Sequence, residues 1–163
     1  MASNIVTSLA YDAIDSKLFL GTHQVVGVAP DSKFVLTRNN DLVIPQVGVD
    51  GDVALSLSRN RTGTLTINLL GVSDTNQYLS LFARSADTTG IVCLPILLTG
   101  ATGAPSFSGI GWIQGIPEVT YVEEAPTLSW TFGIANAFWT MRETTTVLGT
   151  ITDVVNEIAG TNF

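Results

Sequence analysis

Hydrophobic and polar residues alternate along two neighbouring stretches of the chain, residues 53–58 and 64–69. The apolar members are Val53, Leu55 and Leu57 in the first stretch and Leu65, Ile67 and Leu69 in the second. Side chains along a strand point alternately to the two faces of a sheet, so each apolar trio lies on one face. This pattern predicts two strands of a half-buried antiparallel sheet. The polar stretch 59–63 between them ends in glycine and predicts their connection.

Shorter stretches of the same kind predict most of the remaining structure. They are residues 17–20, 24–28, 34–37, 42–44, 92–98, 109–114, 119–123 and 127–134. Gly21-Thr22-His23 predicts a hairpin turn, and residues 39–41 predict a second turn. Pro95 has no backbone N–H, so its apolar run is expected at a sheet edge or a bulge. Trp130, Phe132 and Ile134 alternate with polar or small residues, which predicts one apolar face for the last strand.

Two segments have helical spacing instead. In the first, Ser73 can cap the N-terminus, Asp74 suits its positive end, and Asp74 with Gln77 resembles a capping box. The residues expected to face the sheet are Tyr78, Leu81, Phe82 and Ala86, and residues 87–90 end the helix. A second helix is predicted over residues 145–159. Its apolar stripe consists of Leu148, Ile151, Val154 or Val155, and Ile158.

These elements predict a single, mainly β domain that spans residues 1–163. We expect an antiparallel β-sandwich or partly closed β-barrel of roughly eight or nine strands, with one internal helix. Residues 145–163 are expected to form a C-terminal helix or arm. A fold class of this kind does not by itself give a function.

The charge content of the chain indicates which partners its surface can have. Charged residues make up 13% of the chain, against about 25% in a typical soluble domain. That is too few to cover a free monomer generously, so we expect other subunits to cover part of the surface. The net charge of −7 disfavours a basic nucleic-acid-binding surface. It is compatible with a passage through which nucleic acid slides without sticking.

Residues able to support catalysis or metal binding are few. Cys93, the single cysteine, lies in an apolar run and is expected to be a buried, inert thiol, and the single histidine is His23. Asp50-Gly51-Asp52 lacks the further acids of a calcium loop and predicts a turn. No glycine-rich loop follows a strand and opens a helix. We therefore expect no enzymatic activity, no cofactor and no metal site.

Signals for membrane insertion or export are missing from the sequence. No apolar run reaches the roughly 18 residues of a membrane span. The first residues have neither the positive charge nor the apolar core of a signal peptide. The chain is expected to be made in the cytoplasm and to have no membrane partner.

Several short stretches, taken in order and spacing, are similar to a known family. They are Gly21-Thr22-His23 with Val25-Val26-Gly27, Val49-Asp50-Gly51-Asp52-Val53, residues 59–67, Ser73-Asp74-Thr75-Asn76 before Tyr78-Leu79, Gly111-Trp112-Ile113-Gln114, Pro117-Glu118-Val119, and Leu128-Ser129-Trp130-Thr131-Phe132. Together they resemble the tail-tube subunits of contractile-tailed bacteriophages. The acidic segment after Arg142 is an addition to the usual pattern.

The resemblance implies hexameric rings that stack into a tube inside a contractile sheath, in the tail of a virion assembled in the host cytoplasm. The implied partners are further copies of the chain and the sheath, tape-measure and baseplate proteins, and DNA passes through the lumen during ejection without specific binding. By position, residues 45–52 correspond to a loop that reaches an adjacent ring, so Val47, Asp50 and Asp52 are candidate inter-ring contacts. Arg59 and Arg61 are candidates for pairing with acids of a neighbouring subunit. The candidate contacts of the C-terminal arm are Leu148, Ile151, Val155 and Ile158.

Two other functions stay open. The first is a free-standing β-barrel that binds a small ligand, which would need an apolar interior pocket and a soluble monomer. The second is a tail completion or baseplate protein of similar fold. Size-exclusion chromatography with negative-stain microscopy distinguishes a monomer from rings and tubes.

Overall fold

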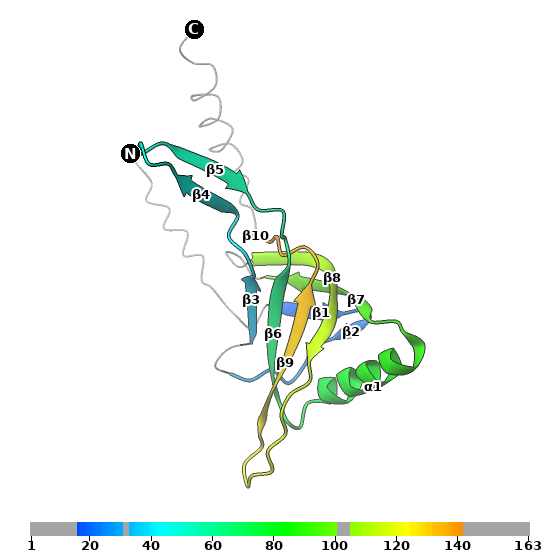
Figure 1. Cartoon of the computed structure of the whole chain (residues 1–163). Coiled ribbons are helices and arrows are strands. Elements are labelled where there is room, and N and C mark those ends of the chain that lie inside the picture. The colour runs from blue at the N-terminus through cyan, green and yellow to red at the C-terminus, as the bar shows by residue number, and fades with distance from the viewer. Residues whose placement is uncertain (1–15, 31–32, 101–104, 142–163) are drawn as a thin grey trace, which may run out of the picture.

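The computed structural model describes residues 16–30, 33–100 and 105–141. The predicted C-terminal helix, with Leu148, Ile151, Val155 and Ile158, lies outside these described residues. Within them, ten strands and one helix form a main body and a projecting hairpin (Figure 1). The elements are β1 (Lys17–Leu20), β2 (His23–Gln24), β3 (Phe34–Arg38), β4 (Val43–Val47), β5 (Val53–Leu57), β6 (Gly63–Leu70), α1 (Asp74–Thr89), β7 (Cys93–Thr99), β8 (Pro105–Gly115), β9 (Thr127–Ile134) and β10 (Thr140–Met141).

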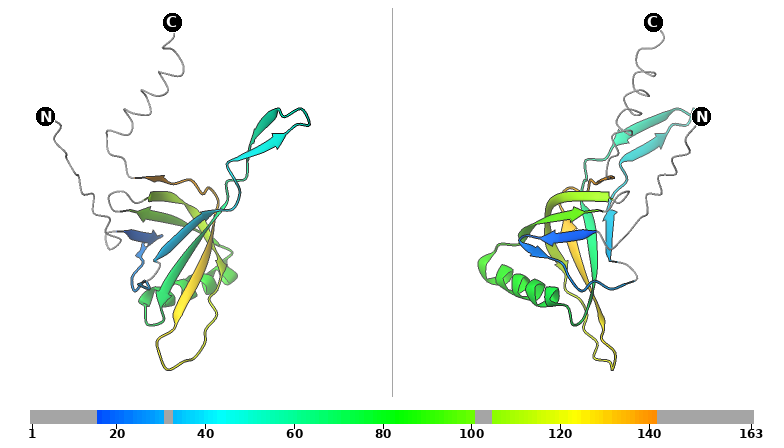
Figure 2. Two further views of the ribbon diagram at one scale, coloured as in Figure 1. Left: turned by 90° about the vertical axis from the view of Figure 1, so that its left-hand side faces the viewer. Right: turned by 180° about the vertical axis from the view of Figure 1, so that it is seen from behind.

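Eight of these strands form one antiparallel sheet in the order β2-β1-β7-β8-β9-β6-β3, with β10 paired to β8. Within the described residues β2 and β3 are its two edges, so the sheet does not close into a barrel. β8 joins the two halves, because residues 107–112 pair with β7 and residues 111–115 pair with β9. The sheet bends at β8, and β1 and β7 cross over β6 and β9 (Figure 2). The mainly β, antiparallel fold class is confirmed.

Two glycines lie beside the bend, where backbone and side chains approach closely. A Cβ on Gly133 would lie 2.4 Å from Cε2 of Trp112, and a Cβ on Gly111 would lie 2.4 Å from Cδ1 of Ile96. Neither distance is compatible with a larger residue. Gly111 in β8 and Gly133 in β9 therefore leave room for the side chains of Ile96 and Trp112 at these close approaches.

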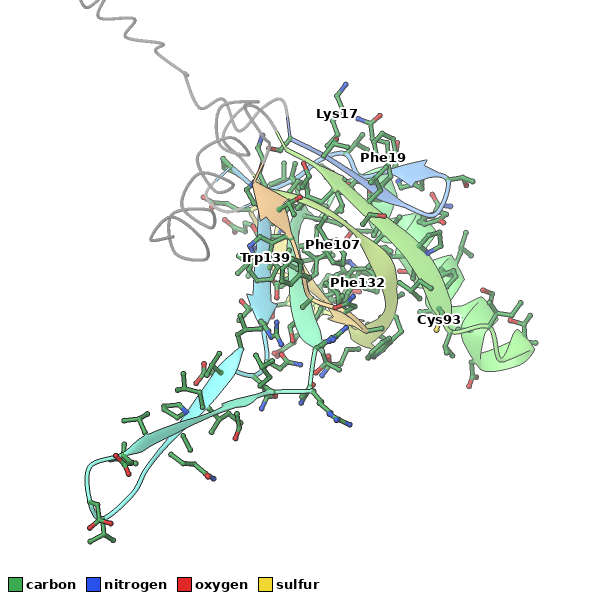
Figure 3. All side chains as sticks on the ribbon, turned by 90° about the horizontal axis from the view of Figure 1, so that it is seen from above. Lys17, Phe19, Cys93, Phe107, Phe132 and Trp139 are labelled. Carbon is green, nitrogen blue, oxygen red and sulfur yellow. The ribbon has the colours of Figure 1, made fainter. Side chains whose placement is uncertain are left out.

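The hydrophobic core lies between the two halves of the bent sheet. β6 and β9 pair in a register that sets Leu65 opposite Phe132 and Ile67 opposite Trp130, and all four side chains are buried. The other half contributes a second group of buried side chains, which includes Leu18, Leu20, Leu94, Ile96 and Phe107. Figure 3 labels Phe107 and Phe132 in the middle of the body. The apolar faces predicted for residues 64–69 and 127–134 are confirmed.

Helix α1 begins and ends where the sequence predicts. The Ser73 hydroxyl accepts a hydrogen bond from the Thr75 N–H (3.2 Å), and Gly90 ends the helix in the left-handed conformation with φ of 73°. The prediction for Leu81 was wrong, because its side chain is 59% exposed while Leu79 is fully buried. The helix packs on the sheet near β2, and this shifts the buried stripe towards Leu79. The third helical residue is Asn76, so the Asp74–Gln77 pair is out of step with a capping box.

His23 has a structural role, because its side chain contacts α1. Its ring stacks on Tyr78 with a centroid distance of 4.4 Å, and Nε2 lies 3.1 Å from the Thr75 hydroxyl. The Tyr78 hydroxyl in turn donates to the carbonyl of Leu20 (3.1 Å). These contacts hold the helix against the turn between β1 and β2.

Three further expectations were wrong. Cys93 is exposed, because it is the first residue of β7 and points away from the core (Figure 3). Pro95 lies in an inner strand, not at an edge or a bulge. The Pro95 carbonyl accepts a hydrogen bond from the Gly21 N–H, so the Pro95 nitrogen points to the same side of β7. On that side, β1 has already ended at Leu20. Residues 119–123 form no strand and belong to the connection between β8 and β9.

Candidate assembly interface

Strands β4 and β5 form a two-stranded hairpin that stands away from the main body (Figures 1 and 2). We call residues 43–57 the arm and residues 47–53 its tip. The ladder runs from the Val43–Leu57 pair at the base to the Val47–Val53 pair at the tip. A turn closes it, with Gly48 N–H bonded to the Asp52 carbonyl (2.7 Å) and Gly51 at a φ of 87°. The predicted loop over residues 45–52 is therefore the outer end of a hairpin.

One face of the arm is entirely apolar. The register sets Val43 opposite Leu57, Pro45 opposite Leu55, and Val47 opposite Val53, so these six side chains share a face. Val47, Leu55 and Leu57 are 71%, 70% and 75% exposed. The prediction that Val53, Leu55 and Leu57 lie on a half-buried strand was wrong, because no second layer of the described residues covers the arm.

A polar network holds the base of the arm, which we call the neck (residues 38–42 and 58–62). Asn60 Nδ2 donates to Asn40 Oδ1 (2.7 Å), and Asn39 Nδ2 donates to the Thr62 hydroxyl (3.1 Å). The Thr64 hydroxyl donates to Asn39 Oδ1 (3.0 Å), and the Asn39 N–H donates to the Thr62 carbonyl (3.0 Å). These hydrogen bonds join the two segments of the neck and restrict the movement of the arm relative to the body.

The neck also carries three of the seven basic residues, Arg38, Arg59 and Arg61. Arg38 Nη2 donates to the Asn60 carbonyl (3.3 Å), and Arg59 and Arg61 are exposed. Beside them, a hollow of about 440 Å³ lies in the angle between arm and body, and we call it the crook. Its lining residues are Arg38, Leu42, Leu57, Ser58, Arg61, Asn136 and Phe138.

The predicted site residues fall at opposite ends of the arm. Val47, Asp50 and Asp52 lie together at the tip and are all exposed. Arg59 and Arg61 lie at the neck, away from the tip. Their proposed roles in assembly stay predictions. Sequence reasoning missed Leu42 and Phe138, whose exposed apolar side chains reach the crook from β3–β4 and β9–β10 connections.

A second exposed apolar surface lies at the end of the body opposite the arm. The connection between β8 and β9 extends there, below α1 in Figure 1. Its exposed side chains include Ile116, Val119, Tyr121 and Val122. A hollow of about 300 Å³ lies between this connection and Gly71 and Val72. Exposed apolar side chains therefore lie at both ends of the described structure, on the arm and on this connection.

Among the described residues, no group of three or more His, Cys, Asp and Glu side chains could hold a metal ion. In the same part of the chain, no helix combines the length and the hydropathy needed to cross a membrane. The exposed features that stand out are the apolar arm and the basic neck.

Comparisons with known proteins give one informative result. No family model matches the sequence, and no curated protein sequence matches it. Among solved structures, the fold is similar to a chain of an extracellular contractile injection system, in a structure described as the PVC sheath–tube complex in its extended state. The TM-score is 0.54 at 10% identity, and the match covers 88% of this chain and 99% of the other. This chain thus has the fold of a contractile injection system component.

Proposed function

We propose that this chain is a non-enzymatic structural subunit of a contractile tail, in which hexameric rings stack into the tube. Two observations support the proposal. The fold is similar to a chain of a contractile sheath–tube complex, over almost the whole length of both chains. The arm exposes a continuous apolar face that the body of its own subunit leaves uncovered.

The arm is the observation that carries the proposal. An isolated two-stranded hairpin is marginally stable in water, so an extended one normally packs on something else. Fully burying a Leu or Val side chain contributes about 1.5–3 kcal/mol. Covering the arm with a neighbouring subunit would therefore stabilise the assembly and order the arm at the same time. Contacts made by an arm onto a different surface of the next copy are head-to-tail, and such contacts generate rings or helical stacks.

The charge of the chain suits a tube that conducts DNA. Each subunit carries a net charge of −7, and this charge repeats around every ring. A wall that carries part of it repels phosphates, so DNA can move along the lumen without specific binding. The proposed partners are further copies of the chain, the sheath, and the tape-measure and baseplate proteins, in the tail of a virion.

The proposal can be tested by removing the arm. The Ser58 N–H donates to the Leu42 carbonyl (3.0 Å), so the chain ends left by deleting residues 43–57 already lie together. A short Gly-Ser link between Leu42 and Ser58 should give an armless chain with an intact body. The full chain should form rings and tubes in negative-stain images as concentration rises, and the armless chain should not.

Two results would count against this function. One is a full chain that stays monomeric at high concentration in light scattering, which would favour a free-standing binding domain. The other is normal tubes from the armless chain. Circular dichroism and thermal unfolding of the armless chain provide the control that its body is folded.

A further inference from the structure

We propose that the tip of one subunit's arm docks in the crook of another subunit. The inference rests on the proposed function, because it names the surface to which the arm binds. The tip and the crook have complementary chemistry, and the extended arm keeps them apart within one chain.

The tip combines exposed apolar and acidic side chains. Val49 is fully exposed and Val47 is 71% exposed. Asp50 and Asp52 lie beside them and are also exposed. Within the described residues, neither carboxylate has an ion-pair partner. A site that receives this tip must therefore offer apolar contact and positive charge together.

The crook offers both. Leu42, Leu57 and Phe138 supply exposed apolar side chains to a hollow of about 440 Å³. Arg38 and Arg61 line the same hollow, and within the described residues neither has an ion-pair partner. Arg38 Nε is buried and has no hydrogen-bond partner in the described part of the chain, although Nη2 of the same residue donates to Asn60. The guanidinium charge of Arg38, together with that of Arg61, makes the lining of the crook positive.

The arm cannot reach its own crook. Five consecutive residue pairs, from Val43–Leu57 to Val47–Val53, hold it extended. A strand rises about 3.3 Å per residue, so the turn beyond the last pair lies roughly 20 Å from the base. The neck network further limits folding back. The acidic tip and the basic crook are therefore complementary surfaces that only two different copies can bring together.

A tip-to-crook contact is head-to-tail and leaves each subunit with one free tip and one free crook. It propagates from copy to copy and does not end at a dimer. The acid Asp41 in the neck partly offsets the arginines, but the neck still carries more basic than acidic residues. Opposite charges at the two ends of the contact would favour the correct register over contacts between two tips or two crooks.

The test reverses the charges at each end. The tip variant is Asp50→Arg/Asp52→Arg, and the crook variant is Arg38→Glu/Arg61→Glu. Each variant alone brings like charges together, so its critical concentration for assembly should rise about tenfold or more. An equimolar mixture should assemble again, because each tip then meets a crook of opposite charge. Lys17→Glu/Arg84→Glu, which changes the net charge as much as the crook variant at exposed sites elsewhere, should assemble normally.

Several outcomes would overturn the inference. They are unchanged assembly of either variant alone, loss of assembly in both with no recovery on mixing, and an equal effect of the Lys17/Arg84 control. Since Arg38 is partly buried, Arg61→Glu alone is measured beside the double variant, so that misfolding is not mistaken for lost docking. The proposed function would fail separately, if the armless chain assembled. If the armless chain fails to assemble but the charge reversals have no effect, the arm acts in assembly and docks elsewhere.

Discussion

Substitution of Leu55 by serine tests whether the apolar face of the arm is an interface. Leu55 is 70% exposed and lies in the middle of that face, opposite Pro45. If a neighbour covers it, the exposed part contributes roughly 70% of the value of a fully buried leucine. With about 2 kcal/mol for the whole side chain, the loss is about 1.4 kcal/mol per contact. That corresponds to about a tenfold weaker association constant.

The assay is the critical concentration for assembly, measured by light scattering with negative-stain images of the products. Ile44→Ser is the matched control, since Ile44 is also an exposed apolar residue of the arm but points to its other face. We expect Leu55→Ser to raise the critical concentration about tenfold and Ile44→Ser to change it much less. Thermal unfolding of the monomer should be unchanged in both, because the arm contributes nothing to the core. Equal effects of the two substitutions, or no effect of either, would refute the reasoning.

Three other predictions concern the body and the segment beyond it. Trp130→Phe removes the hydrogen bond from the indole N–H to Asn76 Oδ1 (2.9 Å) and should lower the free energy of unfolding by about 1–2 kcal/mol in urea titrations; an unchanged midpoint would contradict this. Because Cys93 is exposed, a thiol reagent should label it fully in the folded protein, and protection until unfolding would show that it is covered. Removal of residues 145–163 should weaken assembly and leave thermal unfolding unchanged, if that segment docks on a neighbour; a large loss of monomer stability would show that it packs on its own subunit.

The alternating sequence determined most of the body. Where one face of a paired strand covers the core, alternation of apolar and polar residues identifies both the strand and its buried face. It did so for Leu65, Ile67 and Leu69 and for Trp130, Phe132 and Ile134. Local signals also set the ends of α1, because Ser73 and Gly90 act on the backbone within their own turn. These features depend on neighbours in sequence or on a repeating pattern, and both can be read without coordinates.

The tertiary structure decided which apolar faces have a partner. Residues 53–57 and 65–69 have the same alternation, yet β6 lies inside the sheet and β5 lies in the arm. A pattern of side chains specifies a face but not what covers it. The same reason explains Cys93 and Pro95, whose surroundings depend on where β1 and β7 start and stop. It also explains the crook, which brings Arg38, Arg61 and Phe138 together from segments far apart in the chain, because only folding sets the angle between arm and body.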